Sequence, residues 1–200
     1  MRRRGWWGSF PVATGAGVFV AAGLWSGPLR HHFVIVPVAL VASITAGVAW
    51  VDAHTRRIPN VGLIAASVVL FAGALAVTAI DHRPGTSADA GIGLALYAVP
   101  LLLVNLRSPT GLGAGDVKLG VVLGGTAGLV HPLAAPFALA LGCVLALATR
   151  AAIRPTTAMT HAGEPPAQPF APSLVAAWCA MVVAVPGVIR ALGVAWHYRR

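Results

Sequence analysis

The sequence predicts an all-α protein, a polytopic bundle of about six to seven transmembrane helices, from three observations. First, 58% of the 200 residues are apolar and only 10% are charged, whereas soluble domains contain about 25% charged residues. Second, the mean hydropathy is +0.81. Third, six long stretches contain no Asp, Glu, Lys or Arg, and most reach the roughly 20 residues needed to cross a bilayer. These stretches are 5–29, 31–51, 58–80, 90–106, 119–149 and 165–189.

Five of these stretches predict one span each, although 90–106 is at the short limit. The stretch 119–149 is too long for one simple helix, and His131-Pro132 interrupts it near the middle. Proline lacks a backbone donor and disfavours helix at the residue before it, so we expect a tight hairpin there and seven spans in all. These spans leave no room for a soluble domain, so residues 1–200 are predicted to form a single integral-membrane domain.

The basic residues indicate a membrane protein rather than a nucleic-acid-binding one. The net charge is +9, but the arginines and lysine are scattered at span ends and form no patch. Their bias toward loops 52–60, 105–118 and 150–170 places these loops in the cytoplasm and loop 81–89 outside. We therefore predict a multi-pass protein of the cell inner (plasma) membrane that interacts with membrane lipid and not with nucleic acid.

The cysteines and histidines predict no metal site and no cofactor. Cys143 and Cys179 both fall in apolar stretches, and the sequence contains no Cys-x-x-Cys, so buried free thiols are expected. The neighbours His31 and His32 lie at a span boundary without a nearby carboxylate, which favours an interfacial position. Tryptophans near span ends fit an aromatic belt, and Trp178 is among them.

Two of the five acidic residues, Asp52 and Asp116, lie at the ends of apolar stretches. Two predicted spans separate them, and an even number of crossings returns the chain to the same membrane face. A carboxylate at membrane depth costs several kcal/mol unless it is paired or hydrated, which makes it a candidate functional group. Two such carboxylates are the minimum equipment of an aspartic protease.

Each aspartate has a distinctive local setting. Gly111, Gly113 and Gly115 alternate before Asp116, and glycine lets a peptide backbone come close to a carboxylate. A structural alternative is that Asp116 caps the helix that follows it. Asp52 ends an apolar helix, where the negative end of the helix dipole disfavours an anion.

The residues around the two aspartates supply candidate substrate contacts. Pro59 suits a helix N-terminus, so Ile58-Pro59-Asn60 sets the geometry of the next span, and Asn60 could offer its amide to a polar cluster. Lys118 could touch substrate or act as a cytoplasmic anchor, and the sequence does not separate the two. Together with Gly113 and Gly115, these side chains form the predicted substrate-binding set. His54 could tune Asp52 or be a bystander.

These two segments resemble the two signature motifs of the type IV prepilin peptidases, which are membrane aspartyl proteases of the GxGD kind. The first is Asp52 followed by Ile58-Pro59-Asn60, and the second is the series from Gly111 to Leu119, with Asp116 and Lys118 at the matching positions. A weaker similarity covers residues 168–174, at the start of the last span. The resemblance extends over a motif-bearing core of about 35–190.

The resemblance implies an aspartic-type endopeptidase, with Asp52 and Asp116 catalytic and no cofactor. Its substrates would be type IV prepilins or pseudopilins, which serve pili and protein secretion, and it would cleave their short basic leaders at the cytoplasmic membrane face. Family members that also methylate the new N-terminus often carry paired cysteines in a cytoplasmic insertion. This chain has neither that insertion nor the pairs, which implies a compact, peptidase-only form. The rival hypotheses are a small ion- or proton-coupled transporter that uses the two aspartates, and a catalytically idle membrane scaffold.

Overall fold

The computed structural model describes residues 9–27, 29, 33–80, 82, 85–107, 112–152 and 169–192. Within these ranges all regular structure is helical and no strand occurs, which confirms the predicted all-α class. The helices are α1 (Ser9–Ser26), α2 (Ile35–Thr55), α3 (Asn60–Ile80), α4 (Thr86–Arg107), α5 (Ala114–Val130), α6 (Ala134–Ala152) and α7 (Ala171–Ala191).

Six of the described helices are long and apolar enough to cross a membrane, namely α1, α2, α3, α4, α6 and α7. The seventh, α5, has 17 residues and is shorter. The predicted break at His131-Pro132 is confirmed, because α5 ends at Val130 and α6 begins at Ala134. The His131 backbone N–H closes α5 by donating to the Ala127 carbonyl at 2.8 Å. The prediction of six to seven spans is therefore confirmed, whereas the single domain over residues 1–200 stays a prediction.

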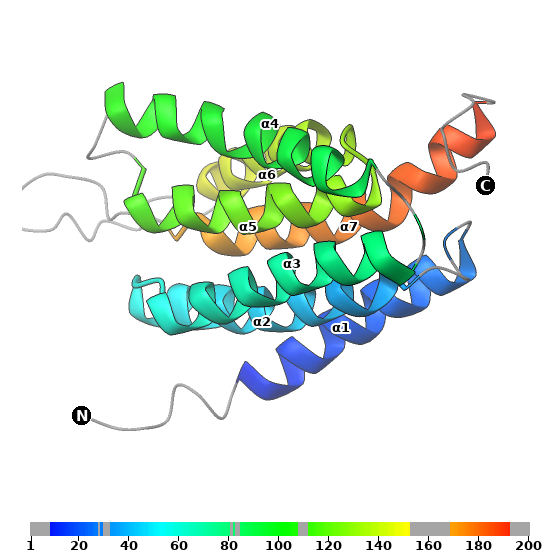
Figure 1. The fold of residues 1–200 in the computed structure, drawn as a ribbon. Helices are drawn as coiled ribbons and strands as arrows, with labels where there is room; N and C mark the ends of the chain where they lie inside the picture. The colour runs from blue at the N-terminus through cyan, green and yellow to red at the C-terminus, as the bar shows by residue number, and fades with distance from the viewer. Residues whose placement is uncertain are drawn as a thin grey trace, which may run out of the picture.

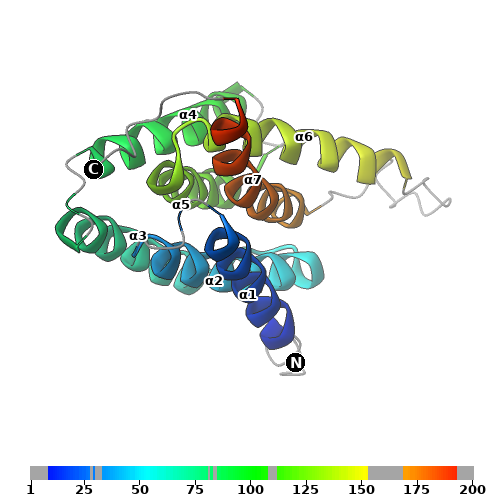
Figure 2. The same ribbon diagram turned by 90° about the vertical axis from the view of Figure 1, so that its right-hand side faces the viewer.

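Helices α1–α3 lie on one side of the bundle and α4–α7 on the other (Figures 1 and 2). Helices α1, α2 and α3 lie side by side in one layer, and α5 and α7 pack between that layer and the outer helices α4 and α6. Accordingly, 12 of the 17 residues of α5 are buried, against four of the 18 residues of α1. The helix that begins beside Asp116 is thus the centre of the bundle.

Glycines allow α4 and α5 to pack backbone against backbone. A Cβ added at Gly124 would lie 2.7 Å from the Gly93 carbonyl oxygen, and one added at Gly120 would lie 2.6 Å from Leu101 Cδ1. At Gly124 the neighbour is backbone, which cannot move aside, whereas at Gly120 it is the end of a leucine side chain. The Gly120 and Gly124 spacing therefore serves close helix packing.

Trp178 corrects the prediction of an aromatic belt. It is completely buried, and its indole N–H donates to the Leu123 carbonyl of α5 at 2.7 Å. A helix carbonyl has a second lone pair, so Leu123 can accept this bond without leaving its helix. Trp178 thus links α7 to α5 inside the bundle. Trp25, by contrast, is 66% exposed near a helix end, as a belt residue would be.

One end of the bundle collects the segments that carry the sequence motifs. Helix α2 ends there and α3, α5 and α7 begin there, at the left of Figure 1. Helix α4 begins at the opposite end, where α3 terminates. The prediction that Asp52 and Asp116 share one face is therefore confirmed, with α3 and α4 as the two crossings between them.

Candidate active site

Asp52 lies in the last turn of α2 and is 6% exposed. Its carboxyl group receives a hydrogen bond from the backbone N–H of Ala171, the first residue of α7. Arg56 caps the C-terminus of α2: its backbone is left-handed, and its N–H donates to the Asp52 carbonyl at 2.7 Å. The beginning of α7 therefore fixes the Asp52 carboxyl at the end of α2.

Asp116 lies in the first turn of α5 and is 9% exposed. Its Oδ2 accepts the backbone N–H of Gly113 at 3.2 Å, and its own N–H donates to the Gly113 carbonyl at 3.0 Å. Gly113, with extended backbone angles, is the residue that caps the helix. The alternative that Asp116 occupies the cap position is therefore wrong. Asp116 is the third residue of the helix, and its side chain folds back onto the cap as in a capping box.

The two carboxyl groups belong to one electrostatic site. A negative charge on Asp52 acts directly on Asp116, although the residues are far apart in the sequence. Arg56 and Arg57, which could have neutralised Asp52, are exposed, and in the described part of the chain no ion pair joins them to it. Two buried carboxyls close to each other cannot both carry a full charge without a large cost.

The segment after Asp52 packs against the segment around Asp116. A Cβ added at Gly115 would lie 3.0 Å from Ile58 Cδ1, so the glycine makes room for this isoleucine. The Lys118 ammonium donates to Asn60 Oδ1 at 3.5 Å, across the starts of α5 and α3. These two contacts join the segment that follows Asp52 to the beginning of α5.

Gly113 differs from Gly115 in its surroundings. It is exposed, and the nearest atom to an added Cβ would be Asp116 Oδ2, at an ordinary contact distance of 3.4 Å. The space beside the Asp116 carboxylate is therefore open at Gly113 and filled at Gly115.

Other predicted candidates lie elsewhere. His54 is exposed, and its Nδ1 is 2.8 Å from the Trp50 carbonyl, so it interacts with its own helix. Gly111, His31 and His32 lie outside the described residues. Within the ranges that the structure describes, no cluster of three or more His, Cys, Asp or Glu could hold a metal ion. The two cysteines are free thiols.

Sequence reasoning missed the contribution of Ala171. An alanine carries no functional side chain, and its role is to place a backbone N–H against Asp52. The only sequence signal was the weak similarity of residues 168–174 to a segment of the prepilin peptidases, which sits where α7 begins.

A comparison with protein-family sequence profiles matches residues 39–150 to the type IV leader peptidase family. This match covers more than half of the chain and contains both aspartates. The chain belongs to the type IV leader peptidase family. No curated protein and no solved structure matches it. Family membership makes this leader peptidase a hydrolase, and its six apolar helices make it a multi-pass membrane protein. The matched region runs from α2 into α6, so α1 and α7 lie outside the family match.

Proposed function

We propose that this leader peptidase is an aspartic endopeptidase that removes the leader from type IV prepilins or pseudopilins at the cytoplasmic face of the inner membrane. The observation that carries the proposal is the pair of buried, interacting carboxyl groups of Asp52 and Asp116 at one end of the bundle. Neither has a compensating ion pair in the described chain. Such a costly arrangement is expected where function requires it.

The proposed chemistry is general acid–base hydrolysis without a covalent intermediate. Because the two carboxyls repel each other as anions, they would share one proton. The ionised carboxyl takes a proton from water as the water oxygen bonds to the scissile carbonyl carbon, and the protonated carboxyl donates its proton to the carbonyl oxygen. When the tetrahedral intermediate collapses, the C–N bond breaks and the departing amine takes the proton first removed from water. As the C=O bond forms again, the hydroxyl proton returns to the carboxyl that had donated it, so the pair again holds one proton.

Backbone donors would keep both carboxyls in the orientation that this chemistry needs. The Gly113 N–H holds one oxygen of Asp116, and the Ala171 N–H holds Asp52. Each bond leaves further lone pairs on its carboxyl group for water and substrate. Fixed donors reduce the reorganisation required at the moment of reaction.

The substrate would enter as a helix within the membrane and has to unwind near the cut, because a hydrogen-bonded helix shields its peptide bonds. The exposed backbone at Gly113 offers space for the unwound segment next to Asp116. Gly115 would act indirectly, by allowing Ile58 to pack beneath the site. We assign Lys118 and Asn60 to the border of the substrate path, where their mutual bond joins α5 to α3.

The test is cleavage of a prepilin from the same organism in membranes. Wild-type protein and Asp52→Asn and Asp116→Asn variants are co-expressed with the substrate, and the product is identified by N-terminal sequencing and intact mass. We expect a shortened, unmethylated product with the wild type only. Equal cleavage by the wild type and both variants would refute the aspartic mechanism. Proton-coupled transport by the wild type without cleavage would favour the transporter hypothesis.

A further inference from the structure

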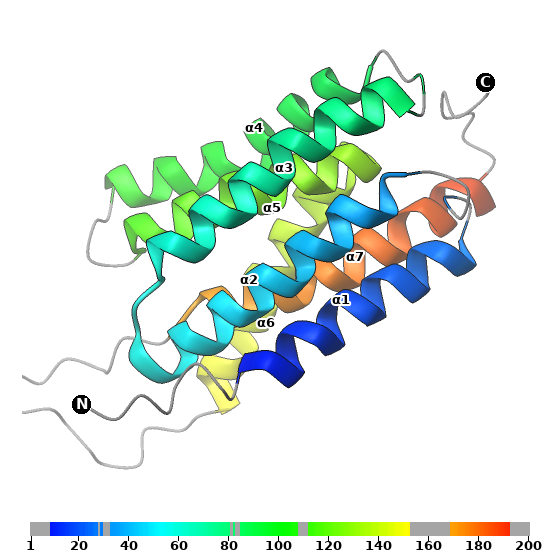
Figure 3. The same ribbon diagram turned by 60° about the horizontal axis from the view of Figure 1, so that its bottom comes forward.

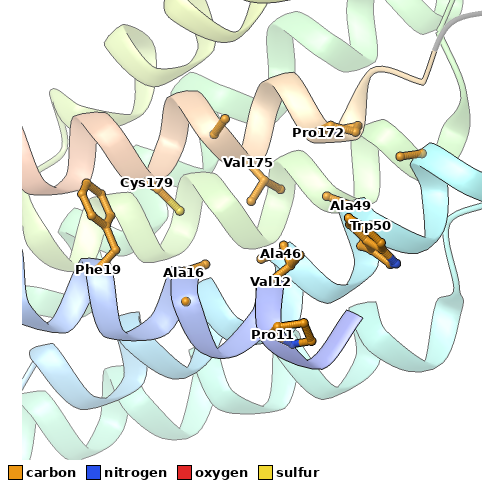
Figure 4. Close-up of a pocket in the computed structure, with 13 residues that line it drawn as sticks. Pro11, Val12, Ala16, Phe19, Ala46, Ala49, Trp50, Pro172, Val175 and Cys179 are labelled. Carbon is orange, nitrogen blue, oxygen red and sulfur yellow. The ribbon is translucent and has the colours of Figure 1, made fainter. Parts of the chain in front are cut away.

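An apolar groove of about 470 Å³ lies between α1, α2 and α7. Figure 4 shows its walls, with Val12 and Phe19 on α1, Ala46 and Trp50 on α2, and Val175 on α7. None of the residues that line it is charged, and six of the 13 are glycine or alanine. Small residues let a neighbouring helix approach closely inside a membrane.

The groove is a wedge that widens toward one end of the bundle. Helices α1 and α7 lie side by side (Figure 3) and are in tight contact at Gly23, where an added Cβ would be 2.5 Å from Val183 Cγ1. The lining residues begin on the other side of that contact, from Phe19 and Cys179 down to Pro11 and Pro172. At 1.5 Å per residue the walls are about 10–12 Å long, which is roughly two helical turns.

The open end of the wedge lies beside the candidate active site. Ala49 and Ala53 of α2 line the groove and flank Asp52 on the same helix. On α7 the lining residue Pro172 directly follows Ala171, whose N–H binds the Asp52 carboxyl. The apolar groove and the carboxyl site therefore share two helix ends.

We propose that this groove binds the first two turns of the substrate's transmembrane helix, immediately after the peptide bond that is cut. The inference rests on the proposed function and adds the position of the substrate. A helix has a diameter of about 10–12 Å, and the groove is open to the surface, so it receives one face of the helix. The other face stays in contact with lipid. A lipid chain would also satisfy the apolar walls, but only a peptide connects this groove to the carboxyl groups at its open end.

The structure offers a matched pair of glycines for the test. Gly15 lines the groove, and a Cβ added there meets no atom within 4 Å. Gly91 on α4 has equally open surroundings and does not line the groove. Gly15→Phe therefore fills the groove without a clash, and Gly91→Phe adds the same bulk elsewhere on the lipid-facing surface.

The measurement is prepilin cleavage in proteoliposomes, at several substrate densities. We expect Gly15→Phe to lower kcat/KM by about tenfold or more, mainly through KM, because the substrate helix loses its packing surface. Gly91→Phe should match the wild type. If the wild type does not cleave, the proposed function fails. If the wild type cleaves and Gly15→Phe cleaves equally well, the groove assignment alone is overturned.

Cross-linking decides the case if Gly15→Phe does not insert normally. Gly15→Cys and Gly91→Cys are each combined with Asp116→Asn and with serine at both native cysteines. The probe is a prepilin with one cysteine in its first apolar turn, and the reagent is a short bismaleimide. An adduct with the prepilin through Gly15→Cys alone supports the inference. An adduct between two copies of the peptidase, equal adducts at both positions, or no prepilin adduct overturns it.

Discussion

The Asp116 carboxyl group has two candidate roles, capping of α5 and catalysis, and substitutions can separate them. It caps the first turn of α5 through the Gly113 N–H, and it interacts with Asp52 as a candidate catalytic acid. Asp116→Asn retains an oxygen that can accept the Gly113 bond but can no longer act as an acid or base. Asp116→Ala loses both the bond and the chemistry.

The two roles differ greatly in magnitude. Loss of a capping hydrogen bond costs about 0.5–2 kcal/mol, which is small beside a folding stability of about 5–15 kcal/mol. The folded fraction of Asp116→Ala therefore stays close to one. Loss of a general acid or base slows a reaction by roughly 10²–10⁴-fold. A purely structural Asp116 therefore predicts nearly normal cleavage by both variants, whereas a catalytic one predicts no cleavage by either.

We expect cleavage to be lost in Asp116→Asn and in Asp116→Ala, with a measurable fall in thermal stability only in Asp116→Ala. The assay is the initial rate of prepilin cleavage normalised to inserted protein, together with a thermal melt in detergent. The Asp52→Asn, Asp116→Asn double variant should be no slower than either single variant, since the pair acts as a unit. More than about one tenth of wild-type activity in Asp116→Asn would refute the catalytic role, because a catalytic carboxyl is worth far more than that.

Three further predictions follow from other parts of the structure. Single cysteines at Thr55 and Ser87, in a background without the native cysteines, should label from opposite sides of the membrane with an impermeant reagent, and labelling of both from one side would overturn the arrangement of spans. Gly113→Val should impair cleavage at normal membrane levels by covering the Asp116 carboxylate. Gly115→Ala should retain most activity, because the gain in helix propensity of about 1 kcal/mol offsets the shift it forces on Ile58. Equal activities of the two variants would argue against a substrate path at Gly113. Burial lowers the pKa of His131 to about 4. Between about pH 6.5 and 4 only the unfolded imidazole is protonated, so the free energy of unfolding should fall by roughly 3 kcal/mol over that range. If the stability of His131→Asn depends on pH in the same way as that of the wild type, this prediction is wrong.

The sequence predicted the number of helices well because the bilayer imposes a length on each span. Runs of about 20 apolar residues have few alternatives in a membrane. The break at His131-Pro132 was equally predictable, since proline disrupts a helix in any surroundings. The shared face of Asp52 and Asp116 followed from counting spans alone.

The rotation of each helix was not predictable, and the error about Trp178 comes from this. In a soluble helix an apolar stripe marks the buried face, but here lipid and core are both apolar and the stripe disappears. Trp178 could therefore be assigned to a membrane interface although it donates to Leu123 inside the bundle. The structural alternative placed the cap of α5 at Asp116 rather than at Gly113, because a glycine-rich sequence does not show which glycine has extended backbone angles.

The electrostatics of the site depend on a third segment that neither motif contains. From α2 alone, an anion at Asp52 is disfavoured, because it sits at the negative end of the helix dipole. The structure sets the N-terminus of α7 against that carboxyl, with the Ala171 N–H as donor, and the positive end of this helix opposes the effect of α2. Asp116 has the same arrangement within its own helix, through the Gly113 N–H. Both carboxyls thus accept a hydrogen bond from a backbone N–H at a helix N-terminus. These donors favour the ionised form of each carboxyl, and at Asp52 they oppose the effect of the α2 C-terminus. Such fixed donors suit the proposed reaction, in which each carboxyl has to be ionised at one point of the turnover.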